Sequence, residues 1–295
     1  MPKVSIKNIE LNYFQTGSGA DLVMAHGLGA NMAFWYPKVA SLLAKEFRVT
    51  LFELRGHGAS SMPASGYTTR DMASDLKGLL DALGIERAHL AGHSFGGGVA
   101  LHFSTLFPER VLSLTLADAV VKSLQPSMKL RDWPYWMETL KEKYASCGIY
   151  LDDGLDLDAD MLNKLADPGL AGARENFRTN DFFLPFGSWN GGRKAAALWQ
   201  KLLSTTTAKD DFKEIGGLGI DDIRKSSSPC LAIYGQHSMF LQTMRALVDL
   251  MPCCKPVIVP GRGHFHPAIE PAFFAAALKD FILGEATPVS GTAAG

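Results

Sequence analysis

The sequence has few cysteines, little net charge and no long apolar run. Its 295 residues include four cysteines, and the formal net charge is -1 at pH 7. The cysteines are scattered, apart from the adjacent pair Cys253 and Cys254, which suits neither a disulfide framework nor a CxxC site. The near-zero charge offers no basic patch for nucleic acid. No apolar run approaches the length that spans a bilayer, and the first residues lack the apolar core of a secretory signal.

These absences narrow the classes of partner and cofactor. We expect a cytoplasmic protein with a small-molecule substrate, no nucleic-acid partner and no membrane partner, while formation of a homo-oligomer stays open. No cysteine and histidine cluster has zinc spacing, and no dinucleotide fingerprint occurs, so we expect no metal and no cofactor.

What is present is an ordinary globular composition, with 47% hydrophobic and 20% charged residues. Short apolar runs alternate with helical patterns, which predicts an α/β domain with a mostly parallel sheet covered by helices on both faces. The predicted strands are 4–9, 11–14, 21–25, 47–54, 87–91, 111–117, 229–234 and 255–259. The predicted helices are 69–83, 97–107, 240–251 and 272–283. The first two strands form an antiparallel hairpin at the edge.

The alternation stops in the middle of the chain. Residues 122–226 contain helical pieces, loops and many aromatic side chains but no convincing strand. We interpret them as a helical cap inserted after the strand that ends at Asp118. The predicted core is then discontinuous, with residues 1–121 and 227–285, and residues 286–295 form a flexible tail.

The strongest local signal is the pentapeptide Gly92-His93-Ser94-Phe95-Gly96, which follows a predicted strand and opens a predicted helix. A sharp strand-to-helix turn lifts its central side chain above the sheet, and the flanking glycines leave room for that turn. The helix N-terminus also favours developing negative charge. Ser94 is therefore predicted to be a nucleophile rather than an ordinary helix cap.

Two further loops supply candidate partners for Ser94. The loop after the first core strand, His26-Gly27-Leu28-Gly29, can aim a backbone N–H at an oxyanion, and the natural donor pair is Leu28 with Phe95. His264 lies in a glycine-flanked loop after the last strand, where a general base can face Ser94. His266 competes for this role, but it precedes Pro267 at a helix start, which favours a capping or supporting role.

Together these motifs resemble the α/β-hydrolase family, in particular its capped esterases, lactonases and meta-cleavage carbon–carbon hydrolases. The resemblance covers residues 1–121 and about 227–284, whereas the cap matches only in location. It implies Ser94 as nucleophile, His264 as base, and Leu28 and Phe95 as oxyanion donors. The Asp or Glu nucleophiles of epoxide hydrolases and haloalkane dehalogenases are excluded, because the residue at this turn is serine.

One position departs from the family pattern. The usual acid stands three residues after the glycine that ends the fifth core strand, and here that residue is Ser238, which carries no charge to stabilise an imidazolium. Asp118, at the end of the strand after Ser94, is the nearest replacement. Some family members take their acid from that strand end. We expect an Asp118 oxygen at about 2.6–3.2 Å from a nitrogen of His264.

The predicted reaction is hydrolysis of an ester, lactone or thioester through an acyl-enzyme. Three alternatives stay open: a meta-cleavage carbon–carbon hydrolase, a cofactor-free haloperoxidase or perhydrolase, and a non-hydrolytic ligand-binding member of the fold. The aromatic residues of the cap favour a substrate with an apolar or aromatic portion. The candidate pocket residues are His26, Trp133, Trp136, Phe182, Phe183 and Trp189.

Overall fold

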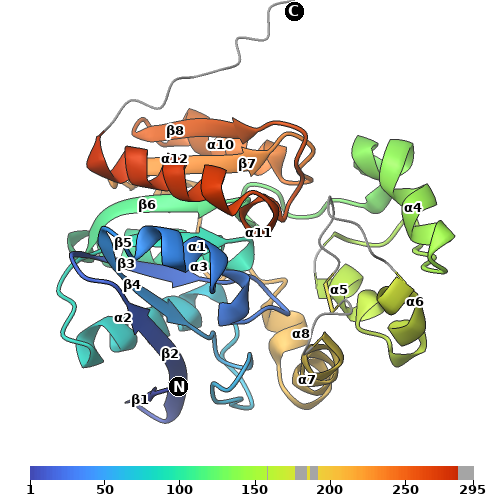
Figure 1. Ribbon diagram of the computed structural model, residues 1–295, viewed down its shortest axis with the longest axis horizontal. Coiled ribbons are helices and arrows are strands. Elements are labelled where there is room, and N and C mark those ends of the chain that lie inside the picture. Colours follow the sequence, from blue (N-terminus) through green and yellow to red (C-terminus); the bar gives the residue numbers. More distant parts are fainter. Residues whose placement is uncertain (158, 177–184, 187–191, 285–295) are drawn as a thin grey trace, which may run out of the picture.

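A computed structural model describes residues 1–157, 159–176, 185–186 and 192–284, which form one eight-stranded sheet with helices on both faces (Figure 1). The strand order is β1-β2-β4-β3-β5-β6-β7-β8. β1 and β2 join the sheet antiparallel, and the other neighbours are parallel. The strands are β1 Lys3–Ile6, β2 Ile9–Thr16, β3 Ala20–Ala25, β4 Phe47–Phe52, β5 Ala88–His93, β6 Val111–Ala117, β7 Cys230–Gly235 and β8 Cys254–Val259. This confirms the predicted fold class.

Side chains of the central strands alternate between two apolar layers. On β3, Leu22 and Met24 face the layer with α1 (Lys38–Leu43) and α12 (Pro271–Leu283), whereas Val23 and Ala25 face the layer with α2 (Thr69–Ala82), α3 (Phe95–Leu106) and α10 (Leu241–Leu250). Both sets are buried, which is why these strands read as continuous apolar runs.

The edge hairpin and α1 differ from the sequence prediction. The turn falls at Lys7 and Asn8 instead of Glu10, because Ile6 pairs with Ile9 and both side chains are buried. Lys7 takes the positive φ of 52° that the tight turn requires. The short helix α1 was not predicted, since its six residues are too few to display a helical period.

The described residues between β6 and β7 form helices, turns and one isolated bridge between Lys129 and Asp156. The helices are α4 Lys141–Ser146, α5 Ala159–Leu165, α6 Ala171–Asn176, α7 Gly192–Thr205, α8 Ala208–Asp211 and α9 Ile220–Lys225. Short 3-10 turns lie at Met32–Phe34, Pro108–Arg110, Leu130–Asp132 and Pro168–Leu170, and a π-helical turn lies at Trp136–Leu140.

Helices α4 to α8 gather beside one end of the sheet (Figure 1). By contrast, α9 packs against α3 and α10 in the layer that covers the sheet. We keep the name cap for residues 122–226, although α9 at its end lies with the core helices. None of the helices in the described parts of the chain is long and apolar enough to cross a membrane.

Candidate active site

Ser94 occupies a strained turn between β5 and α3. Its backbone has φ 56° and ψ -124°, a conformation that a non-glycine residue adopts only when the surrounding structure enforces it. The two flanking glycines are sterically required here. A Cβ on Gly92 would lie 2.3 Å from the Gly96 carbonyl oxygen, and one on Gly96 would lie 2.3 Å from the His26 carbonyl oxygen. The turn therefore has the geometry that the sequence pattern predicts.

Backbone hydrogen bonds hold this turn in place. The Ser94 N–H donates to Ala117 at 3.0 Å, and the Ser94 carbonyl accepts from Gly97 at 3.0 Å and Val120 at 3.0 Å. Among the described residues, the hydrogen bonds of Ser94 are made by its backbone, so its hydroxyl is not bonded to His264. Such catalytic bonds often form only when a substrate closes the site.

Asp118 follows β6 and is completely buried. Its backbone φ is 46°, so Asp118, like Ser94, has a positive φ. One carboxylate oxygen, Oδ2, accepts from the Gly235 N–H at 2.8 Å and lies 3.3 Å from His266 Nε2. The other, Oδ1, accepts from the Ser238 hydroxyl and lies 3.4 Å from His264 Nδ1. Two donors, the Gly235 N–H and the Ser238 hydroxyl, and two histidine ring nitrogens thus surround this carboxylate.

These contacts stabilise the ionised form of Asp118. Burial by itself would raise the pKa of Asp118, but the hydrogen bonds with His264 and His266 outweigh it and lower the pKa from 3.8 to about 2. A carboxylate beside Nδ1 favours the tautomer of His264 that carries its proton there, which leaves Nε2 able to accept a proton. The 3.4 Å separation exceeds the expected 2.6–3.2 Å, so the triad role of Asp118 stays a prediction.

Ser238 stands where the family pattern places the acid, and its hydroxyl contacts Asp118, the candidate acid. Its hydroxyl donates to Asp118 Oδ1 and accepts from the Phe240 N–H at 2.9 Å. The sequence shows that Ser238 has no charge, but it does not predict the contact between Ser238 and Asp118. Asp118 Oδ1 is therefore shared between the Ser238 hydroxyl and His264 Nδ1.

Two other histidines support this arrangement. His93 Nε2 bonds the His264 carbonyl at 2.9 Å, and the two rings lie 4.6 Å apart between centroids. Burial, followed by the nearby His264, lowers the pKa of His93 well below its ordinary value, so the ring is neutral. His266 Nε2 lies 3.1 Å from the Ile233 carbonyl as well as near Asp118. His93, the residue before the candidate nucleophile, thus bonds the loop of the candidate base, a link that the sequence did not indicate.

Both candidate oxyanion donors belong to segments that approach Ser94: Phe95 follows it in the chain, and Leu28 follows Gly27. A turn from Gly27 to Ala30 places Leu28 and Gly29 at its centre, and a Cβ on Gly27 would lie 2.9 Å from the Ser94 Cβ. The Gly29 N–H is occupied, because it donates to His57 Nε2 at 3.1 Å. The N–H groups of Leu28 and Phe95 have no backbone acceptor among the described residues. The geometry leaves this pair available to a ligand oxygen.

His26 lies beneath that turn and is fully buried. Its Nδ1 bonds the Gly27 carbonyl at 2.8 Å, and its Nε2 accepts from the Leu54 N–H at 3.2 Å. Burial lowers the pKa of His26 to about 4, and burial together with His26 lowers the pKa of His57 to about 3. Both are neutral residues that order the loops, and this position gives no support to direct contact of His26 with a substrate.

The predicted pocket tryptophans lie in different environments. Trp133 donates from Nε1 to the His237 carbonyl at 3.1 Å, at the boundary between cap and core. Trp136 donates to Asp153 Oδ1 at 3.1 Å and packs edge-on against Tyr144, within the cap itself. Phe182, Phe183 and Trp189 lie outside the described residues.

An aromatic cluster beside the candidate oxyanion loop was not predicted as a unit. Phe212 contacts Phe95 with ring centroids 5.3 Å apart and stacks on Trp199 at 5.7 Å. Phe186 packs on Gly29, where its ring would lie 2.7 Å from an added Cβ, and its centroid is 6.4 Å from that of Trp199. These rings come from α7, α3 and nearby loops, so sequence spacing could not group them.

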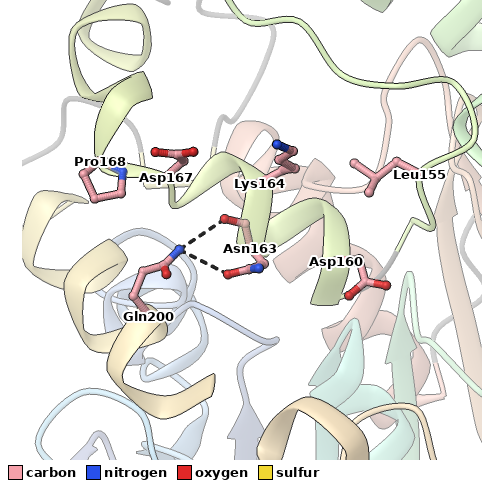
Figure 2. A pocket seen from close by; sticks show the side chains of 7 residues that line it. All are labelled: Leu155, Asp160, Asn163, Lys164, Asp167, Pro168 and Gln200. Carbon is pink, nitrogen blue, oxygen red and sulfur yellow. Dashed lines mark hydrogen bonds between the residues drawn. The ribbon is translucent and has the colours of Figure 1, made fainter. Parts of the chain in front are cut away.

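Two spaces in the described residues differ in their relation to this site. A cavity of about 470 Å³ lies between α5 and α7 (Figure 2), away from Ser94, and no residue of the candidate triad lines it. A much smaller space of about 10 Å³ is lined by Val120 and Phe240, which contact Ser94 and His264 respectively. The large cavity offers no nucleophile and base together, so we do not assign the candidate chemistry to it. The described residues contain no group of three or more His, Cys, Asp and Glu side chains arranged to hold a metal ion.

Comparison with known proteins adds an independent observation. Residues 22–268 match the model of the alpha/beta hydrolase fold family. A fluoroacetate dehalogenase from Burkholderia sp. is 38% identical over 122 residues, which cover 40% of this chain and 40% of the dehalogenase. A putative carbamate hydrolase, RutD, from Pantoea ananatis is 42% identical over 106 residues, which cover 35% of this chain and 38% of that protein. The chain therefore matches about two fifths of the length of these curated relatives.

Among solved structures, a meta-cleavage product hydrolase from Pseudomonas fluorescens IP01 has a TM-score of 0.70. The sequences are 20% identical, and the likeness covers 97% of this chain and 98% of the hydrolase. At this level of identity the likeness concerns the fold alone.

Proposed function

Because this chain belongs to the alpha/beta hydrolase fold family, we propose that it is a serine hydrolase that forms an acyl-enzyme on Ser94. The substrate is an ester, lactone or thioester. The observation that carries the proposal is the ionised, buried Asp118 next to His264, beside a serine in a strained turn. A nucleophile, a base and a group that orients the base are the minimum for this chemistry.

In the proposed reaction, Ser94 Oγ attacks the carbonyl carbon while His264 Nε2 takes the hydroxyl proton. The N–H groups of Leu28 and Phe95 donate to the oxyanion of the tetrahedral intermediate. Asp118 stabilises the imidazolium through Nδ1, and His264 then protonates the leaving group. Water, deprotonated by the same histidine, attacks the acyl-enzyme and releases the acid.

The aromatic cluster supports an apolar or aromatic portion in the substrate. Phe95, Phe186, Trp199 and Phe212 are buried next to the candidate oxyanion loop, and their rings offer a large contact area. Some of these rings contribute to packing of the cap on the core. The proposal therefore concerns the class of acyl or alcohol group and not a particular compound.

Labelling with a fluorophosphonate probe, followed by mapping of the modified residue, tests the nucleophile. We expect the label on Ser94. Replacing Ser94 with alanine is expected to abolish labelling and to lower ester turnover by a factor on the order of 10³ or more, with the melting temperature retained. A folded Ser94→Ala variant with near-native turnover contradicts the proposal.

A panel of substrates separates the reactions that use the same serine. Hydrolysis of aryl esters supports the proposed class, whereas turnover confined to vinylogous diketo acids, or dependent on hydrogen peroxide, points to the meta-cleavage or perhydrolase alternatives. Binding of ligands without turnover or labelling points to a non-hydrolytic member of the fold.

A further inference from the structure

The loop after β7 lies between the cap and the candidate triad. On its core side, Ser238 donates to Asp118, and the Phe240 ring lies 5.1 Å from the His264 ring, with 62° between the planes. The same loop is bonded to the His264 loop, since the His237 N–H donates to the Arg262 carbonyl at 2.8 Å. Residues 237–240 therefore contact both the candidate acid and the candidate base, and we call them the β7 loop.

On its other side, the β7 loop is bonded to the cap. Trp133 donates from Nε1 to the His237 carbonyl at 3.1 Å, and the Tyr135 ring stacks on the His237 ring at 4.3 Å with 7° between the planes. Gln125 donates from Nε2 to the Met239 carbonyl at 2.9 Å. Cap side chains thus donate to the carbonyls of His237 and Met239, the two residues that flank Ser238 in the chain.

Burial makes the bonds from Trp133 and Gln125 to the β7 loop hard to replace. Trp133 and Gln125 are each 5% exposed, and the bond from Gln125 to Met239 is buried while that from Trp133 to His237 is partly buried, so a lost bond is costly to replace with water, most of all at Met239. Gln125 also accepts from the Thr243 hydroxyl at 3.0 Å, which connects the loop to α10. Without them, the stacking of Tyr135 on His237 is left to hold the β7 loop from the cap side.

We propose that Trp133 and Gln125 are positioning residues through which the cap holds Ser238 against Asp118 and so aligns Asp118 with His264. The inference rests on the proposed function, since it concerns the same acid and base. It gives Trp133 a different role from the substrate contact expected from the sequence, because its indole N–H is bonded to the β7 loop. The 3.4 Å contact between Asp118 and His264 is sensitive to such alignment.

The test removes the polar contacts of one cap residue at a time, and Gln125 loses its contact with Thr243 together with its bond to Met239. Trp133→Phe retains an aromatic ring and removes the donor to His237, and Gln125→Leu removes the donor to Met239. The control is Gln200→Leu, because Gln200 likewise donates from Nε2 to a backbone carbonyl, that of Asn163 at 3.2 Å, but within the cap (Figure 2). Each protein is assayed for kcat and KM on one short and one bulky ester, for the rate of fluorophosphonate labelling, and for melting temperature.

We expect Trp133→Phe and Gln125→Leu each to lower kcat and the labelling rate by about three- to tenfold, with KM changed less than about twofold on both esters. Gln200→Leu is expected to keep kcat within about twofold of the wild type. A KM effect that depends on ester size, with kcat unchanged, makes Trp133 a substrate contact and overturns the inference. Equal losses in all three variants, or none in the first two, overturn it as well.

The wild-type protein separates this inference from the proposed function. If the wild type neither labels at Ser94 nor hydrolyses esters, the proposed function fails and the inference fails with it. If the wild type labels normally while Trp133→Phe and Gln125→Leu behave like the control, only the positioning role fails.

Discussion

Replacing Asp118 with asparagine tests the candidate acid, the one member of the candidate triad that departs from the family pattern. Around the carboxylate, Gly235 and His266 donate to one oxygen, and Ser238 and His264 approach the other. An asparagine side chain has one oxygen and one NH₂ group. Its NH₂ group either opposes the donors at Gly235 and His266 or forces Ser238 and His264 to change from donors to acceptors, and the substitution also removes the negative charge.

Two effects follow, with separate magnitudes. Opposed buried donors are expected to lower the free energy of unfolding by about 1–3 kcal/mol. Loss of the charge beside the imidazolium is expected to lower kcat by a factor on the order of 10²–10⁴, by analogy with other triad acids. Ser238→Ala keeps the charge and removes one donor, so a loss of about tenfold or less is expected.

The assay combines kcat on an aryl ester with urea unfolding of each variant at the same pH. Moving the acid provides the sharpest control: Asp118→Asn combined with Ser238→Asp returns a carboxylate to the other side of the same contact. The double variant is expected to recover at least tenfold of the kcat lost in Asp118→Asn. Native kcat in a folded Asp118→Asn variant refutes the role of Asp118, whichever way the double variant behaves.

Three further outcomes are expected. Acetyl esters are expected to have lower kcat/KM than aryl or long-chain acyl esters, because of the aromatic cluster at Phe95 and Phe212, and equal values speak against it. Gly92→Ala is expected to lower the free energy of unfolding by about 1–3 kcal/mol through the 2.3 Å approach to Gly96, whereas Gly172→Ala, with nothing within 4 Å, is expected not to destabilise; calorimetry decides between them. The pKa of Asp118 is lowered from 3.8 to about 2, so its ionisation contributes stability that is present above pH 3.8 and lost as the pH falls towards 2. The stability difference between wild type and Asp118→Asn, measured by urea unfolding, should shrink over that interval and stay constant above it.

The order of strands and helices could be predicted because it depends on local patterns. Buried parallel strands are apolar on both faces, and the helices between them stop at glycine or proline, as α2 does before Gly84. Short elements escaped prediction, as with α1, since six residues do not display a period. The turn of the edge hairpin was misplaced because its position depends on the pairing of Ile6 with Ile9.

The amino-acid sequence by itself determined the candidate nucleophile. The glycines around Ser94 are dictated by a turn that lies within five residues, so the motif carries its own steric reason. Similarly, a glycine-flanked His264 after the last strand is a local feature. Both could be named without knowing what lies next to them.

Only the tertiary structure decided how the candidate acid, Asp118, is held. Asp118 is 120 residues from Ser238 and 146 from His264 along the chain, and the ends of β6, β7 and β8 bring the three side chains together. Whether a buried carboxylate is ionised depends on the donors around it, and these donors come from separate loops. The same holds for the bond from Trp133 to His237, since packing of the cap on the core decides which carbonyl an indole N–H can reach.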